Sequence, residues 1–303
     1  MADQSQITSR DELTNRIIPQ MTLSDGSATS LTAPPIKEAV TDHQVAAQQR
    51  FAIKGTAIVT GGTGTLGLQA ATALLQHGLN KLMLFDLNTS SCQDIISLLR
   101  EQFRDSRIEA LDVDITDDVA IAQAVAKTVE LFDTVDILLN FAGVVNTNHA
   151  LDIPIAQFRR VLDINTTGGF ICSQAVARQM VHQGTGGSIV FVASISGHRV
   201  NFPQPQIAYN VSKAAVLAMK NCLAAEWARY GIRTNSISPG YMDTILNEGA
   251  GLEECRQIWT SRNPSGRMGL PSELTGAILL LASDAGSYIN GADIPVDGGQ
   301  MVF

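Results

Sequence analysis

Residues 56–67 read TAIVTGGTGTLG, a short apolar run that leads into a glycine-rich turn. The segment that follows, from about Thr65 to His77, carries alanine and leucine at helical spacing. We therefore predict a strand, a tight turn and a helix in that order. Glycines in this setting let the backbone turn sharply and let a pyrophosphate approach the helix N-terminus. The stretch favours nucleotide binding, although a glycine-rich turn can also be only a turn.

The alternation of short apolar runs and helix-period segments continues to the end of the chain. We predict further strands at 81–86, 108–113, 135–140, 188–192, 233–238 and 292–296, and helices at 91–104, 117–132, 158–183 and 208–230. Strands separated by helices at this spacing build a parallel sheet, because each right-handed crossover lays its helix against the sheet. We find no internal repeat and no second array after Ser238. The sequence thus predicts a single, doubly wound α/β domain with helices on both faces.

The first 50 residues have a different composition, rich in Ser, Thr and Gln and interrupted by Pro34-Pro35. We predict an N-terminal extension over residues 1–50, flexible or arm-like, before a domain over residues 51–303. The extension lacks the apolar core of a signal peptide and carries too many acids for a transit peptide, so we expect a cytoplasmic protein.

Composition excludes several classes of function. The chain is 45% hydrophobic and 17% charged, which is ordinary for a soluble protein, and its net charge of −8 disfavours nucleic acid and anionic membranes as partners. The four cysteines and five histidines show no metal-ligand spacing, so we predict no metal site. No apolar run reaches the ~18 residues of a membrane span.

Asp86 ends the second predicted strand, 19 residues after Gly67. A carboxylate there can accept hydrogen bonds from an adenosine ribose and would repel a 2′-phosphate. No Lys or Arg follows within residues 87–89. The sequence therefore favours NAD(H) as cofactor and does not exclude NADP(H).

Tyr209 and Lys213 stand four residues apart and so share one face of the helix predicted at 208–230. A phenol with an ordinary pKa near ~10 is a poor acid–base catalyst at neutral pH, and a nearby cation can help by stabilising the phenolate. Ser194 follows the strand predicted at 188–192, where its hydroxyl can orient a substrate oxygen. Each residue alone is a weak signal, whereas the three together predict a catalytic group.

The ordered motifs together resemble the short-chain dehydrogenases/reductases over about Gly55 to Phe303. The resemblance rests on the glycine-rich turn, Asn140-Phe-Ala-Gly143, Asn165, Ser194, Tyr209 with Lys213, Pro239-Gly-Tyr-Met-Asp-Thr244 and Val296-Asp-Gly-Gly299. It implies a Rossmann-type fold, a small-molecule substrate, and hydride transfer between a nicotinamide cofactor and a secondary alcohol or ketone. It also implies a homo-oligomer that pairs the long helices at 158–183 and 208–230.

The resemblance also implies residue roles. Tyr209 would be the acid–base group, Lys213 would bind the nicotinamide ribose and tune Tyr209, Ser194 would hold the reacting oxygen, and Asn165 would support a water-linked proton path through Lys213. The cofactor-binding residues would be Gly61, Thr63, Gly64, Leu66, Gly67, Asp86, Asp114, Ile115, Asn140, Ala142, Gly143, Tyr209, Lys213, Pro239 and Thr244.

Two positions depart from the family pattern. Thr65 replaces the usual middle glycine, and Gly64 makes the turn more like that of the extended branch, which includes epimerases and dehydratases. Against that branch, only 94 residues follow Tyr209, too few for its usual substrate domain. Phe141 stands where relatives commonly carry a second Asn. The glycine at position 64 therefore keeps an NAD-retaining epimerase or dehydratase open as an alternative. A non-catalytic cofactor-binding regulator is a further alternative, which the intact set of Asn165, Ser194, Tyr209 and Lys213 disfavours.

The loop from Ser194 to Tyr209 is similar to that of fungal polyol dehydrogenases and ketose reductases, which act on compounds such as D-arabinitol, mannitol and L-xylulose. His198, Asn201 and Gln204 in this loop could hydrogen-bond the hydroxyls of an open-chain sugar, or could be only a solvated loop. We expect the segment 247–266 to influence substrate choice as well. A reductase of a hydrophobic secondary-metabolite ketone is the alternative within the same class.

Overall fold

One parallel sheet forms the centre of the computed structural model, which describes residues 18–34, 42–247 and 249–302. Within these ranges the sheet has seven strands in the order β3-β2-β1-β4-β5-β6-β7. Their bounds are β1 Thr56–Thr60, β2 Lys81–Asp86, β3 Arg107–Asp112, β4 Ile137–Asn140, β5 Gly187–Val192, β6 Ile232–Pro239 and β7 Asp293–Val296. The predicted doubly wound α/β domain is confirmed.

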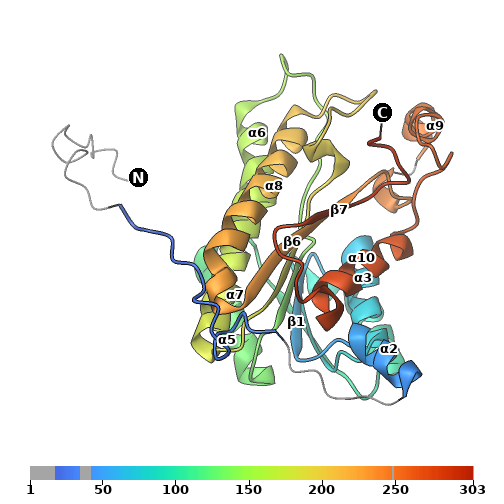
Figure 1. The fold of residues 1–303 in the computed structure, drawn as a ribbon. Helices are drawn as coiled ribbons and strands as arrows, with labels where there is room; N and C mark the ends of the chain where they lie inside the picture. The colour runs from blue at the N-terminus through green and yellow to red at the C-terminus, as the bar shows by residue number, and fades with distance from the viewer. Residues whose placement is uncertain (1–17, 35–41, 248, 303) are drawn as a thin grey trace.

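Helices cover both faces of this sheet (Figure 1). Their bounds are α2 His43–Phe51, α3 Thr65–Gln76, α4 Gln93–Gln102, α5 Asp118–Phe132, α6 Ile155–Leu162, α7 Gly169–Gln183, α8 Ile207–Trp227, α9 Glu253–Ser261 and α10 Thr275–Ala282. Helices α3, α4 and α10 pack on one face, and α5, α7 and α8 pack on the other. Among the described residues, no helix has both the length and the apolar character needed to cross a membrane.

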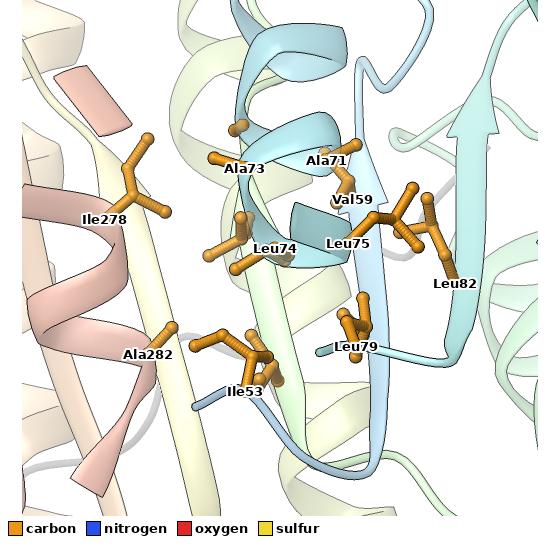
Figure 2. Packing of buried hydrophobic residues seen from close by; sticks show 14 of the residues in the cluster. Ile53, Val59, Ala71, Ala73, Leu74, Leu75, Leu79, Leu82, Ile278 and Ala282 are labelled. Atoms are coloured by element: carbon orange, nitrogen blue, oxygen red, sulfur yellow. The ribbon is translucent and has the colours of Figure 1, made fainter. Parts of the chain in front are cut away.

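The core is divided by the sheet into two layers, as the period of a strand requires. Ala57 and Val59 of β1 face the layer of α3, whereas Ile58 between them faces the opposite layer. Figure 2 shows the first layer, in which Leu75 of α3 lies beside Val59 of β1 and Leu82 of β2. Strands buried on both faces explain why the sequence shows continuous apolar runs there.

The long helix predicted over 158–183 is interrupted. Helix α6 ends at Leu162, a π-helical turn occupies Asp163–Gly168, and α7 begins at Gly169. Gly168 lies so close to the Ile115 side chain that a Cβ on it would come within 2.7 Å of Ile115 Cδ1. The apolar periodicity does not reveal this turn, because the chain stays helical on both sides of it.

The N-terminal extension contains a helix that the sequence does not predict. Residues 43–51 form α2, which begins after Asp42, whose side chain accepts hydrogen bonds from the backbone amides of Gln44 and Val45. No residue of α2 is buried. A helix that buries no side chain needs no apolar stripe, and none in the sequence predicts it. Leu31, farther upstream, lies against Gly231. Two parts of the predicted extension, residues 1–17 and 35–41, lie outside the described residues.

The strand order changes direction between β1 and β4, which pair with each other at the centre of the sheet. In such sheets, ligands bind beyond the carboxyl ends of the strands at this switch point. The glycine-rich turn follows β1, and the segment Asn140-Phe-Ala-Gly143 begins at the end of β4. The two segments therefore meet at the predicted cofactor cleft.

Candidate active site

The glycine-rich turn needs its glycines because the backbone is crowded there. Gly61 has a φ of 61°, in the left-handed region, and a Cβ on it would lie 2.8 Å from the backbone nitrogen of Ala142. A Cβ on Gly67 would clash with the carbonyl oxygen of Gly61. Thr60 fixes the facing segment, because its hydroxyl oxygen accepts a hydrogen bond from Ala142 N at 3.2 Å. The turn is thus held tightly against the end of β4.

A cavity of about 550 Å³ opens beside this turn. Its lining includes ten of the residues that the resemblance assigns to the cofactor: Gly61, Gly64, Leu66, Gly67, Asp86, Asp114, Ile115, Ala142, Gly143 and Thr244. Helix α3 begins after Gly64, which offers no side-chain cap, so the first N–H groups of the helix lack a capping side chain. Uncapped helix amides beside a glycine turn suit a pyrophosphate, and the cavity therefore fits a dinucleotide.

Asp86 uses its two carboxylate oxygens differently. Its Oδ2 accepts hydrogen bonds from the backbone nitrogen and the hydroxyl of Thr63, at 3.1 and 2.6 Å. Among the described residues, its Oδ1 accepts only the backbone N–H of Leu87, at 2.9 Å. One oxygen thus anchors the glycine-rich turn, and the other keeps acceptor capacity toward the cavity that Asp86 lines.

Asp114 and Asn140, two of the predicted cofactor residues, form hydrogen bonds with neighbouring side chains. Hydrogen bonds from the backbone and hydroxyl of Thr116 lower the pKa of Asp114, and the charge of Arg160 adds to this effect. Asn140 donates from Nδ2 to the Ser173 hydroxyl at 3.1 Å, while its buried Oδ1 has no partner within the described chain. Asp114 lines the cavity, whereas Asn140, the last residue of β4, is not among its lining residues.

Tyr209, Ser194 and Lys213 come together at the carboxyl end of the sheet. Ser194 follows β5 and lies within hydrogen-bonding reach of the Tyr209 hydroxyl, and both residues line a second cavity. Lys213 lies one turn along α8, with its Nζ 5.6 Å from the centre of the Tyr209 ring. That Nζ donates to the carbonyl oxygen of Val192 at 2.7 Å. The three predicted catalytic side chains therefore share one site.

Burial controls the protonation of this group. It raises the pKa of Tyr209, against the opposing effect of the Ser194 hydrogen bond, and nearby Tyr241 raises it further. Burial also lowers the pKa of Lys213 to about 8. Burial is the largest influence on the Tyr209 pKa, and the expected tuning of the phenol by Lys213, whose Nζ lies 5.6 Å from the centre of its ring, stays a prediction. A phenol in this state holds its proton at neutral pH.

Asn165 lies in the π-helical turn and ties the site together. Its Oδ1 accepts the backbone N–H of Val144 at 2.8 Å, and its Nδ2 donates to the Val144 carbonyl and to the Ser212 hydroxyl. The same Oδ1 and the Lys213 Nζ both lie next to Gly143. Asn165 thus links the loop after β4 to the helix that carries Tyr209.

The second cavity, of about 480 Å³, joins the cofactor cavity. Leu66 and Thr244 line both of them. Pro239, predicted for the nicotinamide end, lines the second cavity together with Ser194 and Tyr209. A cofactor in the first cavity would therefore reach the catalytic side chains where the two cavities meet.

The predicted substrate residues divide between two places. Asn201 and Gln204 line the second cavity, whereas His198 is not among its lining residues. The His198 Nε2 instead lies 2.9 Å from Asp293 Oδ2 and 3.1 Å from the Ser238 hydroxyl, because its side chain turns toward β6 and β7.

Tyr241 and Trp259 are lining residues that the sequence reasoning did not single out. Their rings stack with centroids 4.2 Å apart and an angle of 7° between the planes. Tyr241 belongs to the quoted Pro239–Thr244 motif and Trp259 to the segment 247–266, and these were the only sequence signals for them. Among the described residues, no group of His, Cys, Asp or Glu is arranged to hold a metal ion.

Comparison with known proteins gives a consistent family. The family described as enoyl-(acyl carrier protein) reductase matches residues 62–301. A D-arabinitol 2-dehydrogenase (ribulose-forming) of Candida tropicalis is 36% identical over 260 residues, 80% of this chain and 90% of its own. An NADP-dependent mannitol dehydrogenase of Alternaria alternata is 33% identical over 255 residues, 83% of this chain and 94% of its own.

Solved structures agree with these relatives. The structure called gox2181 superposes with a TM-score of 0.80 at 37% identity, over 84% of this chain and 99% of its own. An NAD⁺-bound xylitol dehydrogenase superposes with a TM-score of 0.73 at 32% identity, over 81% of this chain and 98% of its own. The fold is thus shared over nearly the full length of both solved chains.

Proposed function

The chain belongs to the short-chain dehydrogenase/reductase family, and we propose that it interconverts an open-chain polyol and the corresponding ketose, with NAD(H) as preferred cofactor. The family is one of oxidoreductases that act on CH–OH and C=O groups with NAD(P). One observation carries the substrate class. The cavity that holds Ser194 and Tyr209 also presents amide and phenol groups, from Asn201, Gln204 and Tyr241.

Each catalytic side chain has a role in the proposed reaction. A nicotinamide dinucleotide, when bound, supplies or accepts the hydride at the substrate carbon. In the direction of reduction, Tyr209 donates its proton to the carbonyl oxygen, and the Ser194 hydroxyl holds that oxygen by a hydrogen bond. Lys213 keeps a positive charge beside the phenol at neutral pH, which stabilises the phenolate left after the proton has moved.

Further residues hold the cofactor in this proposal. Gly61, Gly64 and Gly67 leave room for the pyrophosphate at the start of α3. Asp86 Oδ1 accepts a hydrogen bond from the adenosine ribose, which supports the preference for NAD(H). The relatives include both an NADP-dependent and an NAD⁺-bound enzyme, so this preference rests on Asp86 and not on the family.

A reductase of a hydrophobic ketone is the second candidate, because apolar residues also line the same cavity. They include Leu66, Val145, Val192, Met242 and Leu252. The polar lining residues favour the polyol.

A turnover screen separates the two candidates. NADH and NADPH consumption is followed by absorbance with pentuloses and hexuloses in one set and aromatic ketones in the other. We expect turnover of at least one ketose with a higher kcat/KM than any aromatic ketone. Turnover of aromatic ketones alone would support the second candidate, and cofactor that stays bound without net consumption would indicate an epimerase or dehydratase.

The extension over residues 1–50, a homo-oligomeric state and a cytoplasmic location are also part of the proposal. Exposed apolar side chains on α7 and α8, among them Val181 and Val211, support an interface on that side of the domain. The location rests on the sequence alone.

A further inference from the structure

A hydrogen-bonded network of fixed direction covers one side of the substrate cavity. The Trp259 indole nitrogen donates to Gln204 Oε1 at 3.0 Å. Since an indole nitrogen can only donate, this contact sets the orientation of the Gln204 amide and turns its Nε2 toward Tyr241. That Nε2 donates to the Tyr241 hydroxyl oxygen at 2.9 Å. The direction of the network therefore runs from Trp259 through Gln204 to Tyr241.

The Tyr241 oxygen also receives a second donor. Asn201 Nδ2 donates to it at 2.8 Å. With both acceptor positions of the phenol oxygen occupied, the hydroxyl can make a further hydrogen bond only by donating its own proton. Burial raises the pKa of Tyr241, so this proton is present at neutral pH.

Two hydrogen-bonding groups of this network lack a partner within the described residues. The Tyr241 hydroxyl proton has no acceptor in the bonds that the described chain makes, and the buried Asn201 Oδ1 has no donor. An unpaired polar proton is costly, so the Tyr241 proton calls for an acceptor from a ligand. The oxygen of a substrate hydroxyl in the cavity that Tyr241 lines can accept it, whereas Asn201 Oδ1 is buried away from solvent.

We propose that Tyr241 is a specificity-determining residue that donates a hydrogen bond to one hydroxyl of the polyol or ketose. This inference rests on the proposed function and adds to it. Asn201 and Gln204, which the sequence suggests as direct substrate ligands, act as positioning residues that fix the direction of the Tyr241 proton. Tyr241 lines the same cavity as Ser194 and Tyr209 and influences the pKa of Tyr209, which places its hydroxyl near the reacting group.

The test compares wild type with Tyr241→Phe, which keeps the ring that stacks on Trp259 and removes only the hydroxyl. The substrates are a ketose that wild type reduces and a series of analogues, each with one hydroxyl replaced by hydrogen. In wild type, loss of one particular hydroxyl should lower kcat/KM about 10- to 100-fold. In Tyr241→Phe, removal of that same hydroxyl should have little effect on kcat/KM. Removal of any other hydroxyl should change kcat/KM as much as it does in wild type.

Binding gives a second readout. The polyol and the matching deoxy analogue are titrated by calorimetry into NADH-bound protein. Wild type should bind the analogue with a higher Kd than the polyol, whereas Tyr241→Phe should bind both with similar Kd values. Tyr288→Phe is the matched control, since Tyr288 is fully exposed, and should behave as wild type. Asn201→Ala removes one donor to the phenol and should weaken the discrimination at the same position, which covers the case in which Tyr241→Phe does not fold.

The outcomes separate the inference from the function on which it rests. If Tyr241→Phe discriminates among the analogues as wild type does, the phenol proton is satisfied within the protein or by water, and the inference is wrong although the ketose activity stands. If wild type reduces only ketones without hydroxyls, the proposed function fails and the inference fails with it.

Discussion

Asp86 has a close structural counterpart in Asp112, at the end of the neighbouring strand. Each carboxylate anchors a threonine in the loop that follows a strand: Asp86 holds Thr63, and Asp112 Oδ1 accepts from the backbone and hydroxyl of Thr89, both at 2.7 Å. Only Asp86 lines the cofactor cavity. Asp112 therefore anchors a loop without lining the cofactor cavity, whereas Asp86 does both.

We expect Asp86→Ser to lower kcat/KM with NADH about 10- to 100-fold, because hydrogen bonds to a charged acceptor are lost. Activity with NADPH should fall less or rise, since the charge that repels a 2′-phosphate is gone. Steady-state kinetics with both cofactors measure the ratio. Asp112→Ser should leave this ratio unchanged, and an unchanged ratio in Asp86→Ser would contradict the assignment.

Lys213 gives the reaction a pH dependence. Burial lowers its pKa to about 8, so the ammonium is charged below that pH and loses its charge above it. Tyr209, with its raised pKa, keeps its proton through the same range. We therefore expect kcat/KM for ketose reduction to be level below about pH 7 and to fall as the pH rises through about 8. A pH–rate profile that stays level to pH 10 would argue against a role for the Lys213 charge.

At the scale of elements, α3 joins the cofactor turn to the core. Leu74 on α3 is fully buried in the layer shown in Figure 2. Leu74→Ala should lower the free energy of unfolding by about 2–5 kcal/mol, through lost burial and the cavity left behind. Chemical denaturation measures this change. Leu98→Ala on α4 is the control, because Leu98 is 64% exposed and should cost less than about 1 kcal/mol. Equal losses would place the core elsewhere.

The elements that the sequence predicts correctly are those with a strong burial pattern. Strands β1, β2, β4 and β5 coincide with apolar runs, because the parallel sheet buries both faces of these strands. The sequence does not predict α2, which buries no residue, or the π-helical turn before α7, which depends on the packing of Gly168 against Ile115. Neither feature produces a periodic pattern of apolar residues from which it could be predicted.

The candidate site likewise contains residues that the sequence predicts and residues that it does not. Short motifs predict Tyr209 with Lys213 and the glycine-rich turn, because their members are close in sequence and share one element. Trp259 and Gln204 are 55 residues apart, and their contact exists only after α9 has packed over the loop. Long-range side-chain networks of this kind need the tertiary structure.

At the scale of the whole molecule, the exposed apolar residues of α7 and α8 predict an assembly. Val181 on α7 is 42% exposed. In the proposed homo-oligomer, Val181→Glu should lower the mass measured by light scattering at micromolar concentration, because an unpaired charge would be buried at the interface. Val119→Glu on α5, where the valine is 60% exposed, should leave the mass unchanged. A monomeric wild type would contradict the prediction.

We propose that the two neighbouring cavities form one catalytic site in which Tyr209 moves the proton. The test is the rate of ketose reduction by Tyr209→Phe, with NADH affinity measured in the same preparation. We expect a fall in kcat of about 10²–10⁴-fold with NADH binding retained, because the variant loses the acid and keeps the ring. Near-normal kcat in a variant that still binds NADH would show that the proton donor lies elsewhere.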